Sequence, residues 1–126
     1  MDGLRKILIV EDDVMIREMY RIALVDKGFV VEIADDGDSA YQKVKEFHPD
    51  CILLDIMLPG VSGLEILKEL RTNMVYNCSK TKIVMLTNLA QRNVTENAIA
   101  NGADAFIIKV DILPKDLPTI IQSLKD

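Results

Sequence analysis

The stretch Cys51-Ile52-Leu53-Leu54-Asp55, followed by Ile56-Met57-Leu58-Pro59-Gly60, decides the fold of this chain. A short, solid apolar run is typical of a strand that is buried on both faces of a parallel sheet. This run stops at an aspartate, and two other apolar runs also stop at charged residues. Carboxylates that gather at one edge of a sheet repel one another. We therefore expect Asp55 to serve a function and not stability.

Four further apolar runs indicate strands, and apolar residues at helical spacing lie between them. The runs are Ile7–Val10, Val30–Ala34, Ile83–Leu86 and Ala105–Ile108. The helical stripes are Ile16, Met19, Tyr20, Ala23 and Leu24; Ala40, Val44 and Phe47; Leu64, Leu67 and Leu70; Val94, Ala98 and Ile99; and Leu117, Ile120, Ile121 and Leu124. Five strands that alternate with five helices predict an α/β fold with an open parallel sheet and right-handed crossovers. The 126 residues fit one domain.

The composition excludes several classes of protein. The net charge of -5 argues against a nucleic-acid surface in this segment, although not against a DNA-binding partner. No apolar stretch approaches the roughly 20 residues that cross a bilayer. Cys51 and Cys78 lack zinc-like spacing, so we expect reduced thiols and a cytoplasmic protein. His48 precedes Pro49 at an expected helix end, where a surface position is favoured over catalysis.

Charged and hydroxyl side chains follow the expected strands. Glu11, Asp12 and Asp13 follow the first strand, Asp55 the third, Thr87 the fourth and Lys109 the fifth. In open α/β sheets, the functional crevice lies beyond the carboxyl ends of the strands. We therefore expect these side chains to converge.

The chemistry of this group of side chains favours phosphoryl transfer. Glu11, Asp12 and Asp55 would concentrate negative charge, so a hard cation is needed, and ligands that are all oxygen indicate Mg²⁺. The Asp55 carboxylate can act as a nucleophile toward phosphorus. Lys109 and the Thr87 hydroxyl can then stabilise a phosphoryl group.

At this point the chain resembles the receiver domain of two-component response regulators, a family that includes the chemotaxis response regulator. The resemblance rests on residues 7–13, residues 53–63, Met85-Leu86-Thr87 and residues 102–109. It implies one receiver domain over residues 1–126 with a flavodoxin-like fold, in which the strand order is 2-1-3-4-5 and helices cover both faces.

The resemblance also implies a role for each matching residue. Asp55 would accept a phosphoryl group from a sensor histidine kinase or a histidine phosphotransfer protein. Glu11, Asp12, Asp55 and the backbone carbonyl of Met57 would hold Mg²⁺, with Glu11 acting through water. The chain would catalyse its own phosphorylation and dephosphorylation, with Thr87 and Lys109 assisting.

The family's switch pair falls on Thr87 and Phe106. The face formed by the fourth helix, the fifth strand and the fifth helix would transmit the signal by contacting a partner. That partner would be a downstream effector protein or an output domain beyond this segment. Neither direct nucleic-acid binding nor a membrane is expected, and the sequence leaves open whether the chain stands alone or is part of a longer regulator.

The chain departs from the family pattern at three places. Val110 follows Lys109 where proline with a cis bond is usual, and we expect a trans bond here. Asn88 follows Thr87 where a small residue is usual. The fourth and fifth helices lack the full set of charged residues that forms a homodimer in one subfamily, so that dimer is left open.

The residues beside the phosphorylation site predict a long-lived phosphorylated form. The positions two residues after Asp55 and two after Thr87 are Met57 and Leu89. Both are apolar, and neither orients a hydrolytic water by strong hydrogen bonds.

Two other functions share this fold class. An aspartyl-phosphate phosphatase would carry Asp-x-Asp after its first strand, where this chain has Glu11-Asp12-Asp13. A flavin carrier would need a phosphate loop rich in Ser, Thr and Gly after the first strand, which is absent.

Overall fold

The structure, a computed structural model, describes residues 4–88 and 92–124. Its centre is a parallel five-stranded sheet in the order β2-β1-β3-β4-β5, as predicted. The strands are β1 (Lys6–Val10), β2 (Val30–Ala34), β3 (Cys51–Asp55), β4 (Lys82–Thr87) and β5 (Ala105–Ile108). The sequence pattern therefore gave the correct number of strands in this part of the chain, with bounds that differ by one residue at most.

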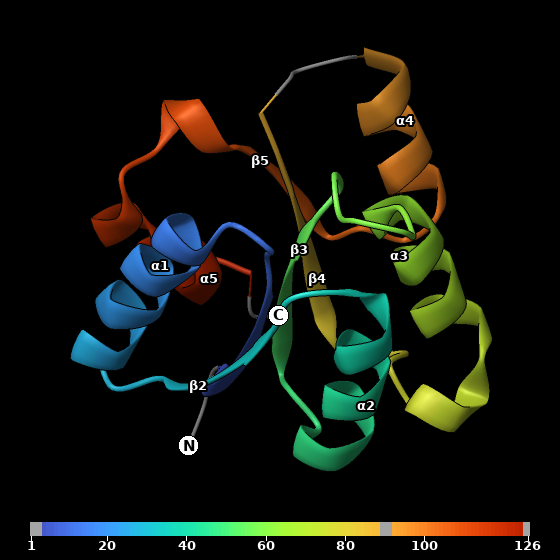
Figure 1. The fold of residues 1–126 in the computed structure, drawn as a ribbon, viewed down its shortest axis with the longest axis horizontal. Helices are drawn as coiled ribbons and strands as arrows, with labels where there is room; N and C mark the ends of the chain where they lie inside the picture. Colours follow the sequence, from blue (N-terminus) through green and yellow to red (C-terminus); the bar gives the residue numbers. More distant parts are fainter. Residues whose placement is uncertain (1–3, 89–91, 125–126) are drawn as a thin grey trace.

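Helices cover both faces of the sheet, and Figure 1 shows α1 and α5 on one face and α2, α3 and α4 on the other. Their bounds are α1 (Val14–Asp26), α2 (Gly37–Phe47), α3 (Gly63–Thr72), α4 (Arg92–Ala100) and α5 (Leu117–Gln122). Short 3-10 helices are η1 (Met74–Tyr76), η2 (Lys109–Asp111) and η3 (Pro114–Asp116). This arrangement confirms the flavodoxin-like α/β fold.

The solid apolar runs are explained by the two layers of helices. Successive side chains of a strand point to opposite faces. Leu8 and Val10 thus pack into the core beneath α2, α3 and α4, while Ile7 and Ile9 pack into the core beneath α1 and α5. Each face is covered, so alternation of apolar and polar residues disappears.

The expected helical stripes are only partly buried. Tyr20, Leu24 and Ala98 lie in the core as expected, with exposed fractions of 3% or less. Met19 and Ile99 are instead exposed by 43% and 62%. Both lie immediately next to a buried residue in sequence, and the rotation of about 100° per residue turns them to the rim of the apolar stripe.

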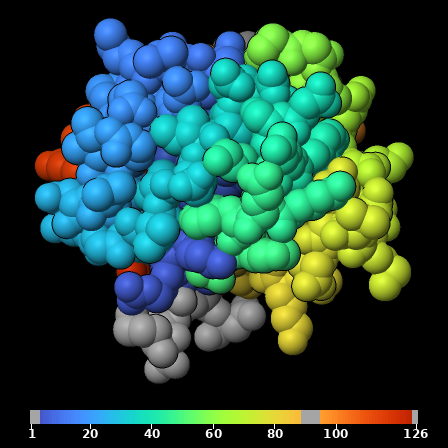
Figure 2. Space-filling view, turned by 60° about the horizontal axis from the view of Figure 1, so that its bottom comes forward, coloured from blue at the N-terminus to red at the C-terminus, as the bar shows by residue number. Residues whose placement is uncertain are grey.

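The segment between α3 and β4 was expected from the sequence to be an irregular surface loop over residues 72–81, but it is partly ordered and partly buried. It contains η1, and it buries Cys78 to 3% exposure. The rings of Tyr41 on α2 and Tyr76 in η1 stack with centroids 5.3 Å apart. In the space-filling view, the yellow segment around η1 lies against the green end of α2 (Figure 2).

Two details of the backbone bear on the function. No peptide bond is cis within residues 4–88 and 92–124, so the Lys109–Val110 bond is trans as predicted, and it lies within η2. No helix in these two ranges combines the length and the hydropathy that a membrane span requires.

Candidate functional site

The buried polar side chains of the described residues lie at one edge of the sheet. Glu11, Asp55 and Thr87 have exposed fractions of 1%, 3% and 4%, and each stands where a central strand ends. Asp55 and Thr87 are the last residues of β3 and β4, which extend one residue further than the apolar pattern indicates. The amide of Ile56 still donates to the carbonyl of Leu86 at 3.0 Å, so Asp55 is fixed by the sheet itself.

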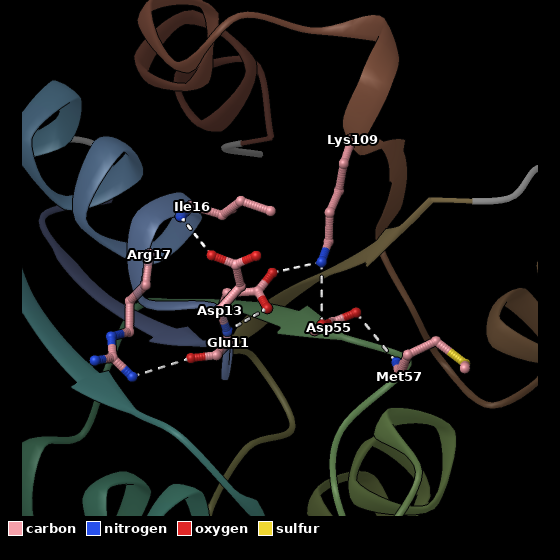
Figure 3. A network of polar contacts seen from close by, with 7 residues as sticks. All are labelled: Glu11, Asp13, Ile16, Arg17, Asp55, Met57 and Lys109. Atoms are coloured by element: carbon pink, nitrogen blue, oxygen red, sulfur yellow. Dashed lines mark hydrogen bonds and ion pairs between the residues drawn. The ribbon is translucent and has the colours of Figure 1, made fainter.

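Lys109 connects the acids of two strands. Its Nζ lies 2.5 Å from Oε1 of Glu11 and 3.0 Å from Oδ2 of Asp55 (Figure 3). The side chains of all three residues are exposed by 7% or less. The ends of β1, β3 and β5 therefore converge as the sequence predicted.

Backbone amides hold the remaining carboxylate oxygens of the two buried acids. The amide of Asp13 donates to Oε2 of Glu11, and the amide of Met57 donates to Oδ1 of Asp55, each at 3.1 Å. Asp13 also caps α1, because its side chain accepts from the amide of Ile16 at 3.1 Å. These bonds fix the directions in which both buried carboxylates point.

The acids form a donor set that fits a divalent cation. Glu11, Asp12 and Asp55 each offer a carboxylate oxygen, and these three atoms lie within 4.8 Å of one another. Asp12 is exposed, so the group opens to solvent on that side. Mg²⁺ prefers such hard oxygen ligands and retains several waters, which an open side accommodates. The side-chain chemistry therefore fits Mg²⁺.

Burial and charge shift the protonation equilibria of this group. Burial raises the pKa of the Glu11 carboxyl, and the hydrogen bond from Lys109 only partly opposes this effect. Burial alone would lower the pKa of Lys109, but the hydrogen bond to Glu11 and the charge of Asp55 outweigh it and raise the pKa. Lys109 is therefore a cation at neutral pH.

The expected switch residues lie on neighbouring strands. Thr87 ends β4, and Phe106 on β5 is partly buried against the core beneath α2, α3 and α4. Met57, two residues after Asp55, has a side chain that is 75% exposed. Leu89, the second apolar residue on which the expected long-lived phosphorylated form depends, lies outside the described residues.

Sequence reasoning missed Arg17. Its Nη1 donates to the backbone carbonyl of Glu11 at 3.3 Å, on the side of Glu11 away from Lys109 (Figure 3). An arginine in the first turn of an amphipathic helix is expected from the sequence to be exposed, and no rule of residue spacing predicts its contact with a backbone carbonyl. Only the three-dimensional structure shows the contact.

A family model, described as the response regulator receiver domain, matches residues 7–122. The DNA-binding response regulator MtrA of Mycobacterium tuberculosis is 38% identical over 124 residues, which are 98% of this chain and 52% of that protein. The phosphate regulon transcriptional regulatory protein PhoB of Escherichia coli is 38% identical over 120 residues, or 95% of this chain and 51% of that protein. The chain thus spans about half the length of these curated relatives.

Two solved structures are similar over nearly their whole length. The chemotaxis protein CheY4 of Vibrio cholerae superposes with a TM-score of 0.87 at 31% identity, covering 97% of this chain and 99% of that chain. A CheY-like receiver domain protein from Methanospirillum hungatei superposes with a TM-score of 0.84 at 31% identity, covering 97% of this chain and 94% of that chain.

Proposed function

This chain belongs to the response regulator receiver domain family of two-component signalling, and we propose that Asp55 is its phosphoacceptor. The observation that carries the proposal is the ion-pair bridge from Lys109 to both Glu11 and Asp55 at the carboxyl edge of the sheet. Among these acids, Asp55 is at the centre of the site, between β1 and β4.

The proposed reaction is a direct transfer. One carboxylate oxygen of Asp55 attacks the phosphorus of a phosphohistidine on a sensor kinase or a phosphotransfer protein. The phosphorus–nitrogen bond breaks, its electron pair stays on the imidazole, and an aspartyl phosphate forms. Water then attacks the phosphorus of the aspartyl phosphate in the same site, the bond between phosphorus and the Asp55 oxygen breaks, and inorganic phosphate leaves. The chain thus catalyses its own phosphorylation and dephosphorylation.

Each neighbouring side chain has a role in this step. Lys109 carries its charge on a stem long enough to follow an oxygen of the incoming phosphoryl group. The Thr87 hydroxyl at the end of β4 can donate to another of these oxygens. Mg²⁺ held by Glu11, Asp12, Asp55 and the carbonyl of Met57 would supply charge stabilisation for the phosphoryl oxygens.

Phosphorylation of Asp55 would change the conformation of a surface next to β4 and β5. A hydrogen bond from Thr87 to the phosphoryl group would draw the end of β4 inward. Phe106, which is only partly buried, would follow it toward the core. The coupled movement of these two side chains would shift the equilibrium between two conformations of the face formed by α4, β5 and α5.

The partner of that face is a downstream effector protein or an output domain beyond residues 1–126, which we treat as one receiver domain. The net charge of -5 argues that the segment itself does not bind nucleic acid, although its relatives MtrA and PhoB are named as DNA-binding or transcriptional regulators. We place the reaction in the cytoplasm, where the family works.

Labelling with acetyl phosphate tests the proposal. With Mg²⁺ present, we expect up to one acid-stable, base-labile phosphoryl group per chain, and none after chelation of the metal. Asp55→Asn should remain unlabelled, whereas Asp26→Asn at the far end of α1 should label like the wild type. Multiple turnover of varied phosphate esters without a labelled protein would instead support a phosphatase.

A further inference from the structure

Arg17 holds the backbone on both sides of Asp12. Its amide donates to the carbonyl of Asp13 at 3.0 Å, and its Nη1 donates to the carbonyl of Glu11 at 3.3 Å. These carbonyls belong to the peptide groups that precede Asp12 and follow Asp13. Asp12 is therefore bracketed by one residue from the first turn of α1.

We propose that Arg17 is a positioning residue for the cation site, a role that rests on the proposed function. Its side chain fixes the plane of the Glu11–Asp12 peptide group, and this plane sets the direction of the Asp12 side chain. Asp12 is the exposed member of the acid group, whereas Glu11 and Asp55 are already held by Lys109 and by backbone amides. Orientation of Asp12 is thus the part of the site that needs support.

The guanidinium acts through the backbone and not on the phosphoryl group. In Figure 3, Arg17 and Lys109 lie on opposite sides of Glu11, and the dashed line from Arg17 ends on the main-chain oxygen. A phosphoryl group on Asp55 would meet Lys109 and not Arg17. This geometry separates the two cations into one that contacts the reacting group and one that holds the loop.

Stability alone does not explain an arginine at this position. The Nε of Arg17 is buried and has no hydrogen-bond partner within residues 4–88 and 92–124. A buried donor without an acceptor is unfavourable. Methionine would fill the same space on α1 without that penalty, so the arginine is better explained by what its Nη1 holds.

Charge and positioning predict opposite effects on metal binding. If Arg17 acted only through its charge, Arg17→Met would remove a cation near a divalent cation and tighten Mg²⁺ binding. If Arg17 positions Asp12, the same substitution weakens Mg²⁺ binding despite the lost repulsion. Arg17→Lys keeps the charge but replaces the rigid planar fork with a single flexible point of contact, so it should also weaken binding.

The test is a titration of the whole chain with Mg²⁺ alone, followed through the amide NMR signals of residues 11–13. We expect Arg17→Met to raise the dissociation constant about tenfold, the lower end of the range for residues that hold metal ligands in place. Arg17→Lys should raise it as well. The control is Arg21→Met, one turn along α1, where the arginine is bound to Glu18 on the surface and the constant should not change.

Equal or tighter binding by Arg17→Met would overturn the proposal, and so would an Arg17→Lys protein that binds like the wild type. If Arg17→Met does not fold, Arg17→Lys alone decides the question. A wild-type chain that binds no Mg²⁺ would overturn the cation site itself. Unchanged variants beside a wild type that does bind would overturn only the role of Arg17.

Discussion

Lys109 Nζ lies 2.5 Å from Oε1 of Glu11, although the two residues are 98 positions apart in the chain. The contact joins the end of β5 to the end of β1 across β3 and β4. Lys109 also reaches Asp55, so one cation serves two buried anions. This bridge keeps the acids together when no metal is bound, and it leads to the first prediction.

Lys109→Met should destabilise the fold without Mg²⁺ and much less with it. Removal of the cation leaves Glu11 and Asp55 as unpaired buried anions, which costs about 3 kcal/mol of unfolding free energy. Bound Mg²⁺ would take over the compensating charge. Urea unfolding with chelator and with excess Mg²⁺ measures both values. The exposed Lys115→Met should change stability little, and an Lys109→Met protein with equal loss in both buffers would contradict the account.

Asp12→Asn should increase the stability of the metal-free protein and remove its response to Mg²⁺. The substitution relieves repulsion at the acid group, which for an exposed side chain is worth about 0.5 kcal/mol. In the wild type, Mg²⁺ at about 100 times its dissociation constant should add about 2.7 kcal/mol.

Thermal unfolding with and without Mg²⁺ measures this difference. Asp26→Asn, at the other end of the same helix, should keep the wild-type response to the metal. An Asp12→Asn protein that is still stabilised by Mg²⁺ to the wild-type extent would exclude Asp12 as a ligand.

Gly63→Ala should disturb the loop that carries Asp55. A Cβ at Gly63 would lie 2.1 Å from the carbonyl oxygen of Asp55 and 2.8 Å from Cα of Ile56. Both are backbone atoms, so β3 or α3 must shift, at about 3 kcal/mol. Gly60→Ala in the same loop is the control: it has φ +85 but open space, and should cost about 1 kcal/mol. The free energy of unfolding of both variants, measured by urea unfolding, checks this. Equal losses would show that the close approach of Gly63 to the Asp55 backbone does not require glycine.

Both cysteine thiols should be inert in the folded protein. Burial raises the pKa of both Cys51 and Cys78 above the ordinary value of a cysteine, so both thiols stay neutral at pH 8. Since the thiolate is the reactive form, a thiol reagent at pH 8 should label the native chain slowly. After unfolding in guanidinium chloride, both thiols should react at once. Rapid labelling of the native protein would contradict the packing of these two residues.

The strands and the rim of the site were predictable from the sequence because they depend on local patterns. Apolar runs mark strands that are buried on both faces, and in a parallel sheet their carboxyl ends meet at one edge. The convergence of Glu11, Asp55 and Lys109 followed from these two rules. Their roles in phosphoryl transfer remain a proposal.

Other features depend on tertiary contacts that no local pattern encodes. Arg17 reads as a surface residue of α1, yet its side chain turns to the carbonyl of Glu11. Ile99 reads as a core residue of α4, yet it is 62% exposed because the neighbouring Ala98 fills the core position. The burial of Cys78 beside η1 was also missed, since its segment shows no periodicity.

The most direct test of the central claim is to locate the phosphoryl group. Phosphorylation with acetyl phosphate and Mg²⁺, followed by borohydride reduction, converts an aspartyl phosphate to homoserine, which peptide mass spectrometry identifies. We predict homoserine at residue 55 and at no other acidic residue, with none in a sample treated with chelator. Homoserine at Asp12 or Asp13, or full labelling of Asp55→Asn, would contradict the account.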